Sequence, residues 1–255
     1  MGVVNITPDS FSDGGQFLDA RAAIEHARRL AADGAHIIDI GGESTRPGAA
    51  PVTEDEELAR ILPVLEELSD LCVSVDTRRP AVMEAALDAG ASMINDVQAL
   101  RAPGASDAVR ESQCAVCLMH MKGEPATMQR EPHYDDVVRE VKAFLQERVT
   151  AAEAAGIARE RIVVDPGFGF GKTAEHNLTL LKRLAEFGDL GVPLLAGLSR
   201  KSTIGRLTGR PADERLAGSL AMALIALQGG ATILRVHDVK ETRDVVAVWQ
   251  ALSSA

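Results

Sequence analysis

Short apolar runs alternate along this chain with segments whose apolar residues recur every three or four positions. A run of four or five apolar residues predicts a buried strand, and the longer period predicts a helix that buries one face. The alternation occurs eight times, and the predicted strands span residues 2–5, 36–40, 71–76, 92–95, 115–119, 161–165, 193–196 and 232–235.

The predicted helices span residues 20–33, 54–69, 79–89, 105–112, 134–155, 173–187, 212–228 and 238–252. Four of them run into a glycine that we interpret as a left-handed C-cap, at Gly34, Gly90, Gly156 and Gly229. Strict alternation of strand and helix indicates an α/β fold with a parallel sheet, and eight units can close it into a (β/α)8 TIM barrel. We therefore expect one domain over residues 1–255. An open doubly wound sheet, which usually has fewer strands, is the alternative.

Polar residues stand at the ends of most predicted strands, where a barrel carries its chemistry. One such residue is easily explained as a helix cap or a satisfied core group, because unpartnered polar groups inside apolar strands are costly. Seven of the eight ends, however, carry Asn, Asp, Lys or Arg, which favours a functional site. The set is Asn5, Asp39, Asp76, Asn95, Asp165, the Ser199-Arg200-Lys201 run and Arg235 with His237, and the remaining end carries Met119-His120.

The segment RIVVDPGFGFGK, residues 161–172, is the most informative of these ends. It predicts a buried strand that ends on Asp165, followed by a loop with alternating glycines and a helix near Thr173. Such glycines let the backbone approach a flat ligand, and Phe168 and Phe170 can wall it. The Gly-Lys-Thr ending resembles a phosphate-binding P-loop, but Pro166 stands where that motif needs its first glycine.

Two loops, 7–15 and 41–48, are long for strand-to-helix connections and rich in Gly, Ser and Thr, which is typical of binding loops. Two different sites follow. Carboxylates, an amide and a lysine suit a ring with amino and oxo groups. Arginines and a histidine at a helix start suit a phosphate, with Mg²⁺ on oxygen ligands. The ring site comprises Asp76, Asn95, Asp165 and Lys201, flanked by Met119 and Phe170; the anion site comprises Asn5, Arg46, Arg235 and His237, with Asp13 beside Asn5 as a ligand of Mg²⁺.

Composition narrows the class of protein. The net charge of −10 argues against a nucleic-acid surface, and no apolar run or signal peptide points to a membrane. Aromatic residues make up only 3% of the 255, so the core is expected to be aliphatic. Cys72, Cys114 and Cys117 do not form a disulfide framework, and we interpret all three as small core residues of a cytoplasmic protein. In a strand, the offset of three would turn Cys114 and Cys117 to opposite faces.

The chain resembles the dihydropteroate synthase family of the bacterial folate pathway. The matching stretches occur in order from Met1 to Thr242 and read MGVVNITPDSFSDGG, DIGGESTRPGA, SVDT, INDV, CLMHM, DPGFGFGK, SRKS and RVHDVKET. The resemblance implies a (β/α)8 barrel, commonly a homodimer, that joins 6-hydroxymethyl-7,8-dihydropterin diphosphate to 4-aminobenzoate and releases pyrophosphate. It also implies inhibition by sulfonamides, which mimic 4-aminobenzoate.

The resemblance also assigns roles to residues. The pterin would contact Asp76, Asn95, Met119, Asp165, Phe170, Gly197, Lys201 and Arg235; the diphosphate Asn5, Thr45, Arg46, Arg235 and His237; the 4-aminobenzoate Phe11, Thr45, Pro47, Phe170, Lys201 and Ser202; and Mg²⁺ would lie on Asn5 and Asp13. Catalysis would depend on Asn5, Asp76, Lys201, Arg235 and His237. Family members usually carry a segment before the first strand that covers the base of the barrel. Here Met1 stands almost inside that strand, so we expect either a shortened version or a start that lies further upstream.

Three other functions fit part of the pattern. We call the polar residues of the ring site the floor. A pterin-binding methyltransferase domain shares the barrel and a similar floor, but has no need of the SRKS and RVHD segments. A Schiff-base aldolase would use Lys201, with Arg200 lowering its pKa, although a floor rich in carboxylates suits a heterocycle better. A non-catalytic pterin-binding protein would keep the ring floor and lose the anion residues.

Overall fold

Eight parallel strands form the centre of the molecule. The computed structural model describes residues 1–6, 15–44, 52–124 and 127–254. Its strands are β1 Gly2–Asn5, β2 Ile38–Gly41, β3 Val73–Asp76, β4 Met93–Asp96, β5 Ala115–Met119, β6 Ile162–Asp165, β7 Leu195–Ala196 and β8 Ile233–Leu234. Neighbours pair in chain order from β1 to β6, and β7 pairs with β8. Bridges from Val164 to Leu194 and from Gly2 to Val236 join these two groups into a closed ring. The barrel is confirmed, and the open sheet is excluded.

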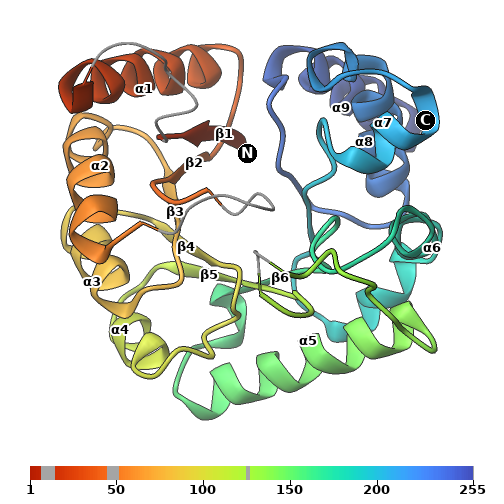
Figure 1. Cartoon of the computed structure of the whole chain (residues 1–255), viewed down its shortest axis with the longest axis horizontal. Helices are drawn as coiled ribbons and strands as arrows, with labels where there is room; N and C mark the ends of the chain where they lie inside the picture. Colours follow the sequence, from red (N-terminus) through yellow and green to blue (C-terminus); the bar gives the residue numbers. More distant parts are fainter. Residues whose placement is uncertain (7–14, 45–51, 125–126, 255) are drawn as a thin grey trace.

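Helices surround this ring (Figure 1). They are α1 Gly15–Ala32, α2 Glu54–Glu67, α3 Pro80–Asp88, α4 Ala105–Arg110, α5 Val137–Ala154, α6 Ala174–Lys182, α7 Ser202–Thr208, α8 Leu216–Gln228 and α9 Val239–Ser253, with 3-10 helices at Arg159–Arg161, Leu184–Leu190 and Ala212–Glu214. The sequence pattern did not predict α7, and it placed the start of α8 four residues too early. The reason is local: α7 is short and contains a glycine and β-branched residues, which are weak helix formers.

The strands alternate between two apolar environments. Outward side chains such as Ile40 and Val164 pack with the helices in the main core. Inward side chains, including Met93, Val163 and Leu195, form a second small core inside the barrel. Alternation along a strand therefore separates the helix-facing layer from the lumen, as β/α barrels require.

The cysteines follow this division in two cases out of three. Cys114 belongs to the outer core and Cys117 to the inner one, so the predicted opposite orientation is confirmed. Cys72 is exposed, and its assignment to the core was wrong. It precedes β3, in the connection from α2, before the strand enters the barrel.

Three of the four glycine caps are also confirmed. Gly34, Gly90 and Gly156 have φ angles of 98°, 97° and 93°. Gly229 is not left-handed, because its φ is −82°. Gly230, with φ 91°, takes that conformation instead, so the turn after α8 comes one residue later than predicted.

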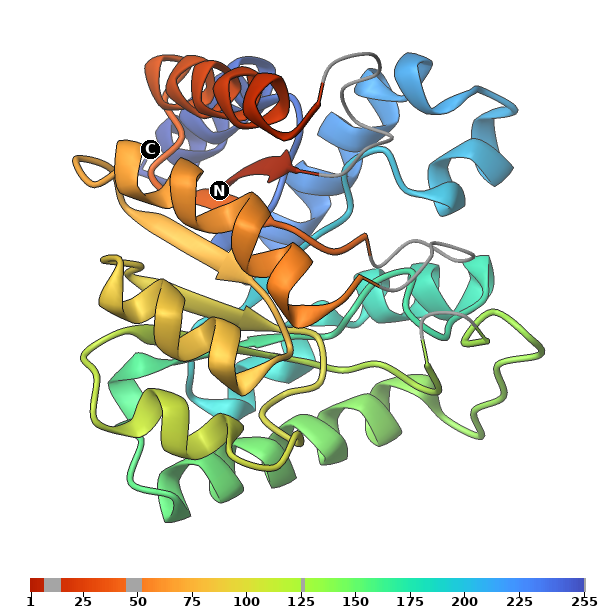
Figure 2. The ribbon, with the colours of Figure 1, turned by 60° about the vertical axis from the view of Figure 1, so that its left-hand side comes forward.

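Within the described residues, no helix combines the length and the apolar character needed to cross a membrane. Figure 2 shows the barrel turned by 60°, with α7 and the 3-10 helix after it projecting from one end. This is the end at which the strands finish, since α7 follows β7. The residues that carry the chemistry gather at this end.

Candidate active site

Strand register places the predicted polar residues side by side at the mouth of the barrel. Asp76 pairs with Asn95 across β3 and β4, and Met119 pairs with Asp165 across β5 and β6. Asn5 ends β1 and is half-buried. Parallel strands in chain order therefore bring together side chains that lie up to 160 residues apart in the sequence. The structure thus brings the predicted floor residues to one end of the barrel.

Arg235 is the central cation of this floor. Its Nε donates to Asp39 Oδ2 at 2.6 Å, and its Nη2 donates to Asp76 Oδ2 at 3.0 Å. Burial lowers the pKa of Arg235, but the charges of Asp39 and Asp76 outweigh this and raise it overall. Burial also raises the pKa of Asp76 to about 7, against the lowering effect of Arg235. The guanidinium is therefore fixed in orientation by two carboxylates from neighbouring strands.

Asp39 is a floor residue that the sequence pattern had not assigned to either site. It is fully buried, and besides Arg235 it accepts a 3.4 Å hydrogen bond from Asn95 Nδ2. Its Oδ1 has no hydrogen-bond partner among the described residues. The signal was present in the sequence, because a carboxylate between the apolar residues Ile38 and Ile40 needs a partner inside the fold.

Lys201 closes the opposite side of the floor. It precedes α7, its Nζ donates to Phe168 O, and it lies 4.6 Å from the centre of the Phe170 ring. Burial lowers the pKa of Lys201 to about 8, while the charge of Asp165 acts in the other direction. Burial likewise raises the pKa of Asp165, and Lys201 limits that rise. Asp165 Oδ1 also accepts from Gly167 N at 2.7 Å, which fixes the carboxylate plane.

Only one of the two loop phenylalanines faces the mouth. Phe168 is 1% exposed and belongs to the outer core, so its predicted role as a wall was wrong. Phe170 packs instead against Met119 in a small apolar cluster, whose other members are Val97, Met121 and Met128. In an extended strand, residues two positions apart would share one face. Gly169 between them has a left-handed φ of 83°, so the backbone turns and the two side chains point to different sides.

Two of the four predicted anion residues, Arg235 and His237, follow β8, whereas Asn5 ends β1 and Arg46 lies outside the described residues. His237 lies just before α9, and its N and Nδ1 are 3.2 and 3.1 Å from Ser199 Oγ. Arg200 forms an ion pair with Asp238, which ties the loop after β7 to the loop after β8. Gly197 follows β7, where an added Cβ would lie 3.9 Å from Arg235 Cβ; Ser202 is exposed at the start of α7. Gly197 thus lies beside Arg235, while Ser202 and His237 lie in the segments that follow β7 and β8.

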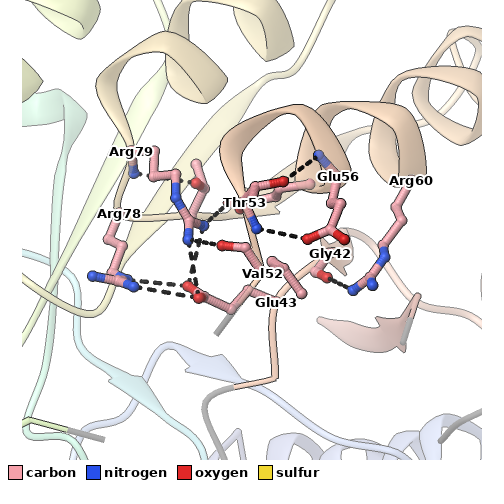
Figure 3. Close-up of polar contacts among 10 residues, drawn as sticks. Gly42, Glu43, Val52, Thr53, Glu56, Arg60, Arg78 and Arg79 are labelled. Atoms are coloured by element: carbon pink, nitrogen blue, oxygen red, sulfur yellow. Dashed lines mark hydrogen bonds and ion pairs between the residues drawn. The ribbon is translucent and has the colours of Figure 1, made fainter. Parts of the chain in front are cut away.

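Five predicted residues lie outside the described parts of the chain: Phe11, Asp13, Thr45, Arg46 and Pro47. The structure does describe both flanks of the 45–51 segment (Figure 3). Arg79 donates to Glu43 before it, at 3.1 and 3.3 Å, and to Val52 O after it. Arg79 also pairs with Glu57, which is 1% exposed. One guanidinium therefore joins the two ends of this segment to α2.

The donor types at the mouth suit a hard cation. Mg²⁺ prefers oxygen ligands, and the amide oxygen of Asn5 is one. Within the parts of the chain that the structure describes, no three His, Cys, Asp or Glu side chains gather as a metal cluster. Asn5 could hold a magnesium ion together with oxygens of a bound phosphate; Asp13, the other predicted ligand, lies outside the described residues.

Comparisons with known proteins agree with this geometry. A model of the pterin binding enzyme family matches residues 1–237. The dihydropteroate synthase of Escherichia coli (strain K12) is 52% identical over all of this chain and 92% of its own length. The chain belongs to the dihydropteroate synthase family.

Solved dihydropteroate synthases have the same fold. The Yersinia pestis enzyme, solved in complex with a sulfonamide drug, superimposes with a TM-score of 0.95 at 48% identity, over 100% of this chain and 94% of that one. The Xanthomonas albilineans enzyme in complex with 7,8-dihydropteroate gives 0.91 at 53% identity, over 100% and 93%. The chain is accordingly an enzyme, a transferase, and the methyltransferase, aldolase and non-catalytic alternatives fall away.

Proposed function

We propose that the mouth of this barrel condenses 6-hydroxymethyl-7,8-dihydropterin diphosphate with 4-aminobenzoate to give 7,8-dihydropteroate and pyrophosphate. The observation that carries the proposal is the convergence of Asp76, Asn95, Asp165, Lys201 and Arg235 at one end of the barrel. The direct test is to mix the two substrates with the protein and measure pyrophosphate. Absence of release by the folded protein would contradict the proposal.

The floor would read the pterin ring edge-on. A carboxylate such as Asp165 accepts parallel hydrogen bonds from a ring N–H and its neighbouring amino group, whereas Lys201 donates to the ring carbonyl. Phe170 and Met119 would cover one ring face, since they form the apolar part of the mouth. Lys201 would exchange its contact with Phe168 O for the ligand.

The bond changes follow from where charge develops. The C–O bond to the diphosphate breaks with its electron pair, and the lone pair of the aniline nitrogen forms the new C–N bond. Arg235 and His237 would stabilise the leaving pyrophosphate, and the Asp76 and Asp165 carboxylates the positive charge on the ring. An aniline nitrogen is already nucleophilic, so the surplus proton can pass to solvent without a strong base. Mg²⁺ held by Asn5 and Asp13 would supply further neutralisation of the diphosphate.

His237→Ala tests the anion site. We expect pyrophosphate affinity to fall by roughly 10- to 160-fold, because one hydrogen bond to a charged group contributes about 1.5–3 kcal/mol. A pterin without phosphates should bind as before, which calorimetric titration of both ligands would measure. Equal loss of both ligands would show that His237 supports the fold through Ser199 instead.

Arg79→Lys tests the tie between the two flanks of the 45–51 segment, which the resemblance assigns to 4-aminobenzoate. Lysine keeps the charge but cannot bind Glu43, Glu57 and Val52 O together, because it lacks the planar fork. We expect KM for 4-aminobenzoate to rise about tenfold, since ordering even one or two residues costs about 1–2 kcal/mol each. KM for the pterin substrate should change little. Arg28→Lys, in an exposed ion pair with Asp70, is the matched control.

We also propose that the enzyme is a cytoplasmic homodimer that sulfonamides inhibit at the 4-aminobenzoate site. Support for the dimer comes from α8, whose thirteen residues include no charged side chain. Its outer residue Ile225 is 44% exposed, and Leu178 on α6 and Leu207 on α7 are 37% and 57% exposed. These three helices pack against one another. A second copy covering this face would remove the apolar area from water.

Ile225→Asp should therefore convert the dimer to a monomer without unfolding it, because a buried unpaired carboxylate opposes association. Light scattering behind size exclusion measures the mass. Val248→Asp, at a residue 70% exposed on α9, is the control and should leave the mass unchanged. An unchanged dimer in Ile225→Asp would place the interface elsewhere.

A further inference from the structure

Side chains donate to each of the five successive carbonyls from Gly167 to Gly171, in the glycine-rich loop between β6 and α6. Its glycines at 167, 169 and 171 have φ angles of 67°, 83° and 61°. Alternating left-handed residues turn successive carbonyls in different directions, so no regular backbone ladder can satisfy them. The donors are Lys172 for Gly167 O and Phe170 O, Lys201 for Phe168 O, Gln129 for Gly169 O and the Tyr134 hydroxyl for Gly171 O.

Lys172 is the only one of these donors that binds two of the loop's carbonyls, and it is 2% exposed. Its Nζ lies 2.9 Å from Gly167 O and 3.0 Å from Phe170 O. It also lies 2.9 Å from His120 Nδ1 and 3.3 Å from His120 O, at the end of β5. Burial lowers the pKa of Lys172, and the charge of Asp165 acts in the other direction. The carbonyl oxygens of His120, Gly167 and Phe170 can accept the three hydrogens of the ammonium form, which a buried charge requires. Lys172 therefore holds the loop after β6 against the end of β5.

His120 is suited to be an acceptor in this arrangement. Burial, followed by the nearby charge of Lys172, lowers the pKa of His120 to about 2, so the ring stays neutral. Its ring meets Phe144 edge-on at 4.9 Å between centroids, which fixes the ring plane. A neutral imidazole whose Nδ1 faces an ammonium must carry its hydrogen on Nε2.

The glycine-rich loop packs directly on the backbone of His120 and Lys122. An added Cβ at Gly167 would lie 1.9 Å from His120 O, and one at Gly171 would lie 2.3 Å from Lys122 O. At these two glycines the loop therefore packs tightly on the backbone that follows β5. The loop in turn supplies the N–H of Gly167 to Asp165 and carries Phe170, which packs with Met119.

We propose that Lys172 is a positioning residue for the pterin. It fixes the orientation of the Asp165 carboxylate by holding Gly167, and that of the Phe170 ring by holding the Phe170 carbonyl, without touching substrate. The inference rests on the proposed pterin floor and adds a residue to it. A lysine that served only the fold would change stability and leave pterin affinity as it is. The two roles therefore differ in what is measured on the folded variant.

The test is Lys172→Met, which keeps an unbranched side chain of similar length and removes its donors. We expect pterin affinity in calorimetric titration to fall by about tenfold or more, the effect of losing one or two hydrogen bonds to a charged group. KM for the pterin diphosphate should rise in parallel, while KM for 4-aminobenzoate at saturating pterin changes less than about threefold. Lys142→Met, at a surface lysine paired with Asp189, is the matched control and should retain pterin affinity.

Folded Lys172→Met with unchanged pterin affinity would overturn the inference, even if its melting temperature is lower. If this variant does not fold, Tyr134→Phe and Gln129→Ala decide, because each removes one donor to the same loop. Weaker pterin binding by either supports the positioning role, and unchanged binding by both overturns it. Asp165→Asn, measured in the same titration, distinguishes failure of the Lys172 inference from failure of the proposed pterin site. If Asp165→Asn also binds pterin normally, the proposed pterin site is wrong.

Discussion

Arg235→Met is expected to lower the free energy of unfolding by about 3–5 kcal/mol, the usual cost of removing one partner from a buried ion pair. The reason is that two carboxylates would remain without their cation. Asp39 is fully buried and would lose the guanidinium that donates to it at 2.6 Å, and Asp76 would lose its 3.0 Å contact. Urea unfolding measures the change, and the melting temperature should fall by roughly 6–10 °C for a chain of this size.

A double-mutant cycle isolates the cause. Asp39→Asn with Arg235→Met removes both members of the pair, so the double variant should lose less than the sum of the two single losses. Arg235→Lys should fall between wild type and Arg235→Met, because lysine keeps the charge but cannot span both carboxylates. Strict additivity would mean that the pair does not hold the floor together.

Asp165→Asn is expected to weaken pterin binding by about 2–4 kcal/mol, or roughly 30- to 900-fold in Kd. Asp165 Oδ1 accepts from Gly167 N at 2.7 Å, and an asparagine can keep that bond with its amide oxygen. Its amide nitrogen then replaces the second carboxylate oxygen. This amide nitrogen is a hydrogen-bond donor, and it would face an N–H of the pterin, which is also a donor.

Asp96→Asn is the matched control for this substitution. Asp96 also lies at a strand end and is fully buried, but its two oxygens accept from Gln98 N and Leu100 N at 2.7 Å each. Its loss should reduce stability and spare the pterin. Calorimetric titration of both variants with a pterin lacking the diphosphate makes the comparison. Unchanged affinity in Asp165→Asn would remove that residue from the proposed floor.

Local pattern was a good guide to where the polar residues would lie and a poor guide to what they bind. Asp76, Asn95 and Asp165 could be expected at the mouth because each ends an apolar run, and parallel strands end on the same side. The short helix α7 escaped prediction because seven residues with a glycine carry little periodic signal. Phe168 and Phe170 were indistinguishable by sequence, since only the turn of the loop sends one into the core.

The sequence by itself determined the eight alternating units, the closed barrel that they imply and the set of residues at its mouth, because period and strand ends are local properties. Tertiary structure alone decided the pairings. Arg235 meets Asp39 across 196 positions, and Lys172 meets His120 across 52. Such contacts depend on barrel closure and on the direction that each loop takes. A buried charge without a partner costs free energy, so each of these groups needs a partner. The partner lies far away in the sequence, and no local stretch of residues identifies it.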